Sequence, residues 1–410
     1  MNAEIISVGT ELLLGNSTNT DARDVSRALA EIGVNVFWHT VVGDNPARLT
    51  ECLYRARNRA DLIITTGGLG PTCDDLTKQT VARAFDRELY FDQAAMDSIA
   101  AWFGEQGRTF PENNRAQAWL PEGSTVMANT CGTAPGCIFE VDGLVVAMLP
   151  GPPRECNAML KNELIPWLSR RSGQTIRSHM VRMFGVGESA MEEKLRDLMD
   201  GSNPTVAPYA KLGECLARVT AKADTQAECE ALTAPVVEEI CRRMGDVVYA
   251  IDAESLEARV LQLLGEKKKT IATAESCTGG MIAQRITAIP GASAFYKGGF
   301  NVYTEEAKTR LLGIKPGFIA GHGVVSAAVA AKMARRARKR LKADLGVGVT
   351  GWAGPDGDDV GLVYVALAAK GECYVRRLQL GRHSDRERIR TIAAHNAFDM
   401  ARRYLTGLDI

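Results

Sequence analysis

The feature that most constrains the fold of this chain is the alternation of short buried strands with amphipathic helices, in which the strands end at glycines. Residues 5–8 and 61–66 are strand-like runs that lead into Gly9 and into residues 67–70. Between them, apolar side chains recur three and four positions apart from residue 22 to residue 32, which is the spacing of one helix face. This alternation predicts a parallel sheet covered by helices on both faces.

The two glycine-rich turns indicate where a ligand would bind. In open α/β sheets, ligands lie beyond the carboxyl ends of the strands. Gly9 and residues 67–70 both follow such ends, so we expect a site at this edge of the first domain.

The length of 410 residues allows two or three domains at roughly 150 residues each. The patterns divide the chain into a doubly wound α/β domain at residues 1–170, a small α+β module at 171–252 and a second α/β domain at 253–410. The middle module shows no catalytic cluster, so we expect it to connect the other two or to dimerise.

The charge balance argues against polyanionic partners. Lys and Arg number 49, as do Asp and Glu, so the net charge is zero and no global field would hold nucleic acid or an anionic membrane. The basic run at residues 335–340 ends an alanine-rich helical pattern, where cations suit the helix dipole. We therefore expect neither nucleic acid nor membrane as a partner.

The cysteine pattern indicates a reducing compartment. Ten cysteines are scattered without a C-x-x-C pair. A chain with a sizeable core needs no disulfide framework, and neither a signal peptide nor an apolar run of ~20 residues is apparent. These observations predict reduced thiols and a cytoplasmic location.

A serine-containing turn in the last domain is the strongest candidate for chemistry. Ser276 follows a strand, and Gly279 and Gly280 open the next helix, where unpaired N–H groups would suit an anion or an oxyanion. The alternative is that Ser276 or Thr278 merely caps the helix. Cys277 is a rival nucleophile, although packing is the more common role of such a cysteine.

Three further segments carry reactive residue types in the same domain. Tyr303 and Lys308 stand five residues apart across a strand-to-helix junction, and Thr350 ends a strand before a glycine-rich turn. Residues 384–390 place several cations at a helix start, where an anionic ligand would offset their unfavourable interaction with the dipole.

These runs resemble the C-terminal domain of the CinA family, the nicotinamide mononucleotide deamidases, and the resemblance extends over the whole chain. It implies hydrolysis of the carboxamide of nicotinamide mononucleotide to nicotinate mononucleotide and ammonia, without a metal. It also implies that Ser276 is the nucleophile, Lys308 its base and Tyr303 an orienting or proton-relaying group. Thr350 would line the site, and Arg386 or Arg390 would hold the phosphate or assist the base. The implied substrate-binding residues are Glu275, Cys277, Thr278, Gly279, Gly280, Gly351, Gly354 and Arg390.

The implied chemistry agrees with the residue types. A serine needs an adjacent base, and no histidine stands near Ser276 in these motifs. A lysine can serve only if its pKa falls from ~10.4 toward ~7–8, which burial and neighbouring arginines would achieve.

Two departures from the family pattern bear on the substrate. Trp352 stands where isoleucine is usual, and the loop at residues 355–361 is short and carries Asp356, Asp358 and Asp359. Asn301 also occupies a usually apolar position. A pocket reshaped in this way would alter specificity and rate more than the nucleophile.

The first domain resembles the molybdopterin-binding fold. In the CinA family, this domain is associated with ADP-ribose pyrophosphatase activity. Residues 67–77 match its glycine-rich signature, in which Thr72 and the glycines would cradle a phosphate. Asp74 and Asp75 of this signature, together with Asp44, would hold a divalent cation, and potassium is a second candidate ion. Asp74 could instead cap a helix. The implied ligand-binding residues are Gly9, Glu11, Asn19, Gly67, Gly68, Gly70, Thr72, Asn129, Gly132 and Thr133.

The leading hypothesis is a bifunctional enzyme, expected to be a homodimer, with nicotinamide mononucleotide and ADP-ribose as its small nucleotide partners. A molybdopterin-type transferase and a non-catalytic nucleotide-binding regulator are the two alternatives.

Overall fold

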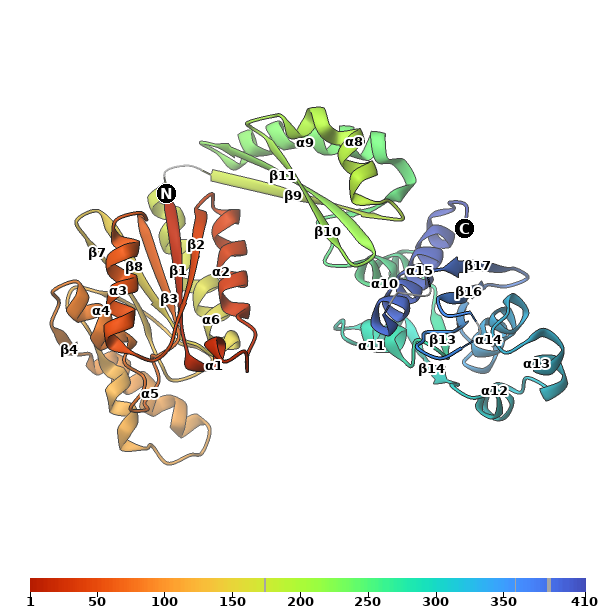
Figure 1. Cartoon of the computed structure of the whole chain (residues 1–410), viewed down its shortest axis with the longest axis horizontal. Coiled ribbons are helices and arrows are strands. Elements are labelled where there is room, and N and C mark those ends of the chain that lie inside the picture. Colours follow the sequence, from red (N-terminus) through yellow and green to blue (C-terminus); the bar gives the residue numbers. More distant parts are fainter. Residues whose placement is uncertain (173–174, 358, 382–384) are drawn as a thin grey trace. The chain divides into compact units, whose positions relative to one another are not determined.

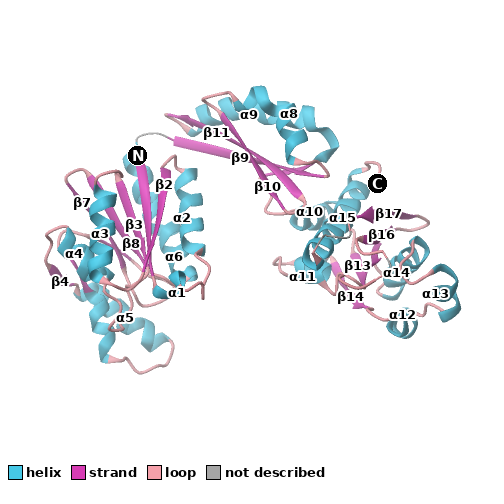
Figure 2. Ribbon diagram, viewed as in Figure 1, coloured by secondary structure: helices cyan, strands magenta, loops and turns pink. Residues whose placement is uncertain are grey.

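The computed structural model describes residues 1–172, 175–357, 359–381 and 385–410 (Figures 1 and 2). The chain forms two compact units. One comprises Met1–Arg177 with Ala221–Ala231, and the other comprises Ser178–Thr220 with Leu232–Ile410. The three-domain division of the sequence stays a prediction.

The first unit is built on a six-stranded sheet in the order β2-β1-β3-β8-β7-β6. The first four strands pair in parallel, whereas β7 pairs antiparallel with both β8 and β6, so the expected parallel sheet is wrong for this edge. The reason is the short connection from β7 to β8, since a parallel crossover needs a dozen or more residues. The strands are β1 (Asn2–Val8), β2 (Asn35–Val42), β3 (Leu62–Thr66), β6 (Thr125–Met127), β7 (Gly136–Val141) and β8 (Leu144–Leu149).

Helices cover both faces of this sheet, as the sequence predicts. Along β1, Ile6 packs into one apolar cluster with Leu53 of α3, and Ile5 packs into another with Val25 of α2. Figure 1 accordingly shows α3 and α2 on opposite sides of the strands. The helices are α1 (Thr10–Leu13), α2 (Thr20–Glu31), α3 (Pro46–Arg57), α4 (Thr77–Ala84), α5 (Gln93–Glu105), α6 (Pro153–Met159) and α7 (Ile165–Ser172). A 3₁₀ turn at Glu112–Ala118 and the pair β4 (Leu89–Phe91) and β5 (Trp119–Pro121) complete the unit.

The sequence predicts one closing helix over residues 155–168, but a wide π-type turn at Leu160–Leu164 separates α6 from α7. Pro166 explains the interruption, because it has no N–H to donate to residue 162 and its ring crowds that carbonyl.

The middle module contains an antiparallel sheet in the order β10-β11-β9-β12. The sequence predicts two of its strands and both of its helices but omits β10 and β12, which are short or largely exposed and therefore carry a weak pattern. The elements are β9 (Thr175–Phe184), α8 (Glu188–Met199), β10 (Thr205–Lys211), β11 (Glu214–Ala223), α9 (Gln226–Met244), a 3₁₀ turn (Gly245–Val247) and β12 (Val248–Ile251).

The C-terminal part is a five-stranded sheet in the order β14-β13-β15-β16-β17, parallel over the first three strands and antiparallel over the last two. Helix α14 lies close on β15, because a Cβ on Gly348 would come within 2.3 Å of the Ala330 carbonyl oxygen. The strands are β13 (Ile271–Glu275), β14 (Tyr296–Asn301), β15 (Leu345–Gly351), β16 (Leu362–Ala368) and β17 (Cys373–Gln379). The helices are α10 (Leu256–Glu266), α11 (Met281–Thr287), a 3₁₀ turn (Ala292–Ala294), α12 (Glu305–Leu312), α13 (Pro316–His322), α14 (Ala327–Arg340) and α15 (Arg386–Thr406).

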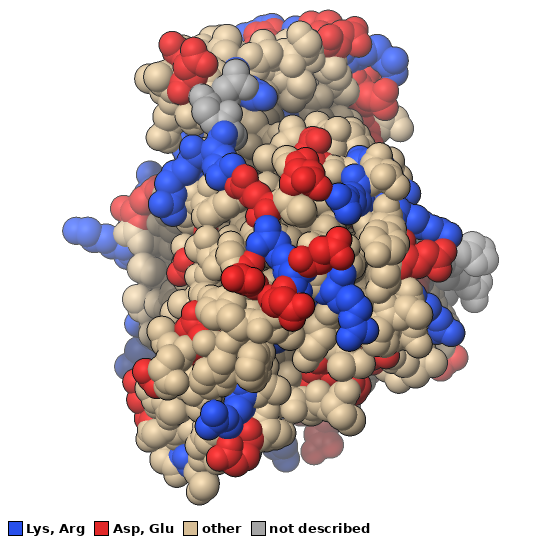
Figure 3. All heavy atoms as spheres, turned by 90° about the vertical axis from the view of Figure 1, so that its left-hand side faces the viewer, with Lys and Arg blue, Asp and Glu red and all other residues tan. Residues whose placement is uncertain are grey.

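The cysteines, the basic run and the surface charges are each the subject of an expectation from composition. No disulfide joins the ten cysteines, each of which lies in a described segment. The basic run forms the end of α14, as expected. On the face drawn in Figure 3, acidic and basic side chains are interspersed. None of the helices described is both long and apolar enough to cross a membrane.

Candidate functional site

The candidate site of the second unit lies where β13 and β15 end side by side. Because the two strands are parallel, the turn after Glu275 and the turn after Thr350 meet at one edge, and the Ser276 N–H donates to the Val349 carbonyl at 3.0 Å. A cavity of about 190 Å³ opens at this edge. Its walls are Ser276, Cys277, Tyr303, Lys308, Val324, Val325, Thr350, Gly351, Trp352, Ala353, Gly354, Asp356 and Arg386.

Ser276 and Lys308 form the reactive pair of this cavity. The Lys308 ammonium nitrogen lies 3.1 Å from the Ser276 hydroxyl oxygen, 3.0 Å from the Val302 carbonyl and 3.4 Å from the Tyr303 carbonyl. A neutral amine has two N–H donors and one lone pair. The two carbonyls can accept the donors, which leaves the lone pair for the serine hydroxyl.

Burial prepares Lys308 for this state. Its side chain is 0% exposed. Desolvation lowers the pKa of Lys308 below its ordinary value, and the nearby Cys277 and Glu305 oppose that shift only in part. The expected help from neighbouring arginines is not among the causes, so burial is the dominant effect.

Local sequence explains how Lys308 reaches the serine. Thr304 caps α12, and its hydroxyl accepts the Ala307 N–H at 3.1 Å. Lys308 stands one turn further on, on the buried face of the helix with Leu312.

Tyr303 acts through a different atom from the one expected. Its side chain is 59% exposed, and its phenol oxygen accepts a hydrogen bond from Arg386 at 3.0 Å. The Tyr303 atom beside Ser276 is its carbonyl oxygen, at 3.4 Å. Proton relay through the phenol is therefore not supported, because its recorded partner is an arginine, which can only donate.

The turn after Ser276 corrects the interpretation of the helix start. The N-cap of α11 is Gly280, and no side chain caps it, so the helix-cap alternative for Ser276 and Thr278 is wrong. Instead, Glu275 accepts the N–H groups of Ile282 and Ala283 at 3.0 and 2.9 Å. Glu275 is 1% exposed, so its carboxylate occupies the helix N-terminus and is not available to bind substrate.

The remaining residues of this turn have structural contacts. Gly279 and Gly280 adopt φ of 62° and 92°, which glycine tolerates best. Thr278 is fully buried, and its carbonyl accepts a hydrogen bond from Arg390 at 2.9 Å. Thr278, Gly279, Gly280 and Arg390 do not line the cavity, so their expected direct role in binding is not supported.

Cys277 lines the cavity but is poorly suited to attack. Burial raises the pKa of its thiol to about 12, despite the opposing effect of nearby backbone N–H groups and Lys308. The thiol is thus protonated near neutral pH, which disfavours the rival nucleophile.

The turn after β15 forms the opposite wall. Thr350 is 1% exposed, and its hydroxyl donates to the Val324 carbonyl at 2.9 Å. Gly351 and Gly354 line the cavity beside Trp352, as do Val324, Val325 and Asp356. Sequence reasoning missed the two valines as site residues, because the segment between α13 and α14 carries no motif.

Two of the arginines at the start of α15, Arg386 and Arg390, donate to acceptors within the protein. Asp385 caps the helix and Glu387 lies in its first turn, so the expected electrostatic cost of these arginines is already offset within the protein. Arg386 donates to the Gly354 carbonyl at 2.5 Å as well as to Tyr303, and so bridges two walls of the cavity. Ser384 and Asp358 lie outside the described residues.

In the first unit, the glycine-rich turns follow β1 and β3 at one edge, as the sequence predicts. A Cβ on Gly67 would lie 2.2 Å from the Val8 carbonyl, and one on Gly68 would meet Thr77. Gly70 packs against Asp75 in the same way, and Gly9 against Glu11. These glycines are explained by close approach within the protein.

The expected metal ligands are held by neighbouring hydroxyls. Asp44 accepts the N–H and hydroxyl of Thr10, each at 2.8 Å. Thr72 donates its N–H to Asp75 at 2.9 Å and its hydroxyl to Asp74 and Asp75. Asp74 does not cap α4, whose N-cap is Leu76 without a side-chain bond, so that alternative is wrong.

The fit to a metal ion is poor in this arrangement. Among the described residues, no group of three or more His, Cys, Asp or Glu side chains is gathered in a geometry that could hold a metal. Binding of a divalent cation or potassium by the first unit stays a prediction from the resemblance.

The other expected ligand residues of this unit form internal contacts. Asn19 caps α2 through Ala22 and donates to Ser7 at 3.0 Å. Asn129 donates to Glu155 and to the Ala134 carbonyl at 2.7 and 2.9 Å. Gly132 lies against the Glu155 carboxylate, and Thr133 is half-buried in the same turn.

Lys78 is a buried charge that the sequence did not reveal. It is 2% exposed, and it donates to the Gln117 carbonyl at 2.6 Å. Burial lowers its pKa to about 8. The only sequence feature that points to Lys78 is its position one residue after the glycine-rich signature.

Fold and site together define a multi-domain α/β protein with a molybdopterin-binding-like first domain and a buried Ser–Lys pair in its last domain. Three family models match the chain. They are described as "Probable molybdopterin binding domain" at residues 4–170, "Damage-inducible protein CinA KH domain" at 178–250 and "CinA C-terminal domain" at 253–405.

Full-length relatives establish the family. A "CinA-like protein" of Desulfovibrio desulfuricans is 48% identical over 416 residues, covering 100% of this chain and 97% of the relative. Another "CinA-like protein", from Dictyoglomus thermophilum, is 45% identical over 413 residues, with both chains fully covered. The chain belongs to the CinA family. The crystal structure of the protein CinA from Thermoplasma acidophilum is 34% identical and covers 39% of this chain and 95% of its own, with a TM-score of 0.37.

Proposed function

We propose that the C-terminal part of this chain hydrolyses the carboxamide of nicotinamide mononucleotide, with Ser276 as nucleophile and Lys308 as general base. The observation that carries the proposal is the contact of 3.1 Å between the Lys308 nitrogen and the Ser276 hydroxyl. The same nitrogen is buried, and desolvation favours the neutral form that a base requires. In that form, its two N–H groups can still donate to the carbonyls of Val302 and Tyr303.

The reaction runs in two halves. Lys308 takes the Ser276 proton as the serine oxygen bonds to the amide carbon. It then returns that proton to the amide nitrogen as the carbon–nitrogen bond breaks and ammonia leaves. Water attacks the resulting ester in the same way, giving its proton to Lys308, which passes it to the departing serine oxygen. The acid so formed loses its remaining proton to solvent and leaves as the carboxylate, and the starting enzyme is restored.

The tetrahedral intermediate needs hydrogen-bond donors for its oxyanion. In the described segments, the N–H groups of Cys277 and Thr278 donate to no backbone carbonyl, and they follow the nucleophile directly. They are the candidate donors, and removing one such donor typically costs about 3–4 kcal/mol of transition-state stabilisation.

The size of the cavity supports entry of the ring alone. Pockets for whole ligands span roughly 300–1,000 Å³, whereas this cavity has about 190 Å³. We assign it to the carboxamide-bearing ring, with the phosphate toward Arg386 at the rim. This assignment explains a basic residue beside a small, partly apolar site.

The test is ammonia release from nicotinamide mononucleotide by the purified full chain and by Ser276→Ala. We expect release by the wild type and its loss in the variant, with Ser98→Ala, which removes an exposed hydroxyl of α5 outside the cavity, retaining activity as the matched control. Absence of turnover with tight binding would instead indicate the nucleotide-binding regulator. Equal release by Ser276→Ala would reject the nucleophile.

A further inference from the structure

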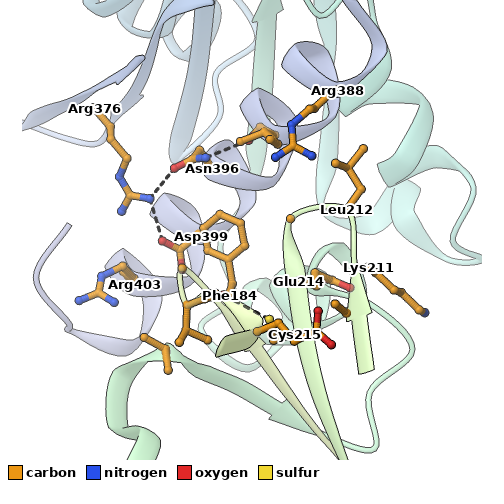
Figure 4. A pocket seen from close by; sticks show the side chains of 18 residues that line it. Phe184, Lys211, Leu212, Glu214, Cys215, Arg376, Arg388, Asn396, Asp399 and Arg403 are labelled. Carbon is orange, nitrogen blue, oxygen red and sulfur yellow. Dashed lines mark hydrogen bonds and ion pairs between the residues drawn. The ribbon is translucent and has the colours of Figure 1, made fainter. Parts of the chain in front are cut away.

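A second and larger cavity lies within the unit Ser178–Thr220 and Leu232–Ile410, between the middle module and α15 (Figure 4). Its volume is about 610 Å³, which is within the range of roughly 300–1,000 Å³ for ligand sites. It contains none of the residues assigned to the Ser276 site. The walls are Phe184, Gly185, Val186, Gly187, Glu188, Ala210, Lys211, Leu212, Gly213, Glu214, Cys215, Val247, Arg376, Arg388, Ile392, Asn396, Asp399 and Arg403.

Polar contacts fix one wall of the cavity against the other. Arg402 is 3% exposed and donates to the carbonyls of Asp246 and Val248 at 3.0 and 3.3 Å, besides its ion pair with Asp399 at 2.7 Å. These bonds hold α15 to the segment before β12, so the hollow has defined walls.

A buried histidine adds to this junction. The His395 Nδ1–H donates to the Thr391 carbonyl at 3.0 Å, so its Nε2 can accept from Arg285 at 3.1 Å. Phe184 stacks on the ring with centroids 6.0 Å apart, and Glu214 lies 3.9 Å from Nε2. Glu214 also accepts the Tyr249 hydroxyl at 2.8 Å.

The charges of the lining leave a cationic excess. Its cations are Lys211, Arg376, Arg388 and Arg403, and its carboxylates are Glu188, Glu214 and Asp399. Some of these groups are paired within the protein: Glu214 binds Tyr249, Asp399 is shared by Arg376 and Arg402, and Arg403 pairs with Asp246. Among the described lining groups, this leaves Lys211 and Arg388 against Glu188.

Arg388 is the cation best placed to receive an anion. It forms no ion pair with any residue that the structure describes, and Figure 4 shows its side chain over the cavity near Asn396. Across the cavity, α8 begins after Gly187, where no described side chain caps the N–H groups and Glu188 stands in the first turn. A helix N-terminus and a guanidinium both favour a phosphate or carboxylate.

Much of the remaining lining is apolar. The larger apolar side chains are Phe184, Val186, Leu212, Val247 and Ile392. A ligand for the whole cavity therefore needs an anionic group at one end and a ring or other apolar body at the other.

We propose that this cavity binds a small phosphate monoester with a ring system, of the nucleoside monophosphate class, and that Arg388 contacts its phosphate. The site is separate from the Ser276 cavity, although both use α15. Arg386 and Arg390 on that helix contact the walls and loop of the Ser276 site, whereas Arg388 and Ile392 line the second cavity.

The experiment uses the full chain with adenosine monophosphate as probe, with adenosine and inorganic phosphate as comparison ligands. Affinity is measured calorimetrically, and amide hydrogen exchange with bound probe locates the site. We expect slower exchange at residues 185–188 and 210–215. Arg388→Glu should weaken binding at least tenfold, since it replaces attraction with repulsion.

The control variant is Arg377→Glu, an exposed neighbour on β17 that lines neither cavity. It makes the same charge change and should bind as the wild type does. Circular dichroism confirms that both variants are folded, and Leu212→Asp probes the opposite wall if Arg388→Glu is unstable.

The outcomes separate this proposal from the deamidase. Protection confined to residues 276–281 and 303–308, or equal weakening by Arg377→Glu, would overturn it. Adenosine binding as tightly as the monophosphate would also overturn it. The test does not depend on ammonia release, because the affinity of Ser276→Ala for adenosine monophosphate should equal that of the wild type.

Discussion

Replacing Lys308 with methionine removes the base while keeping a side chain of similar length. In the structure, the substitution deletes the nitrogen 3.1 Å from the Ser276 hydroxyl and leaves the carbonyls of Val302 and Tyr303 without that donor. A positioned general base contributes about 10²–10⁴-fold to rate, which corresponds to about 2.7–5.5 kcal/mol of barrier. We expect kcat/KM to fall by that factor.

The pH profile gives the sharper test. Only the neutral amine can accept the Ser276 proton, so activity should rise with pH through the pKa of Lys308 and then level off. Because burial lowers this pKa, the rise should lie below the ordinary value of 10.5. In Lys308→Met this limb should disappear from kcat/KM measured by ammonia release across pH 6–10.

Two controls test whether the loss of activity comes from the missing base. Ser276→Ala and the double variant should be about as slow as Lys308→Met, since residues that act as a unit are not additive. Methionine is also uncharged and apolar, so thermal unfolding should show a folded protein. A variant within threefold of the wild type, or one that keeps the same pH limb, would refute the role of Lys308.

Three further predictions concern stability. Arg402→Ala should cost about 1–3 kcal/mol in urea unfolding, because the buried Asp399 keeps Arg376 but loses its second partner, and a loss under about 0.5 kcal/mol would contradict this. Lys78 has a pKa of about 8 when folded and 10.5 ordinarily, so the unfolded chain binds more protons between these values. The wild type should therefore gain stability over Lys78→Met by up to about 1.4 kcal/mol per pH unit in that window, and a pH-independent difference measured at pH 8 and 9.5 would exclude it. Gly348→Ala should cost about 1–3 kcal/mol by overpacking, whereas Gly317→Ala, with nothing within 4 Å of its added Cβ, should cost far less; equal melting temperatures would contradict the close approach of α14.

The local pattern of the chain determined much of the architecture. Helical spacing between residues 22 and 32 and the buried runs before Gly9 and Gly67 predicted α2, β1 and β3. These elements are set by the alternation of apolar and polar residues, which is a property of neighbouring positions. The motif around Ser276 likewise indicated the family, which the full-length relatives confirm.

Tertiary structure decided which atoms face one another. Glu275 and Ser276 are adjacent in one motif, yet the first is consumed by the N–H groups of α11 and the second opens onto the cavity. Burial, which lowers the pKa of Lys308, depends on the packing of α12 and cannot be read from a five-residue spacing to Tyr303. The combination of parallel and antiparallel pairs in the first sheet arises from contacts between segments distant in sequence. The cavity beside Arg388 arises in the same way. Spacing along the chain sets local conformation, whereas desolvation and hydrogen-bond partners depend on the packed three-dimensional structure.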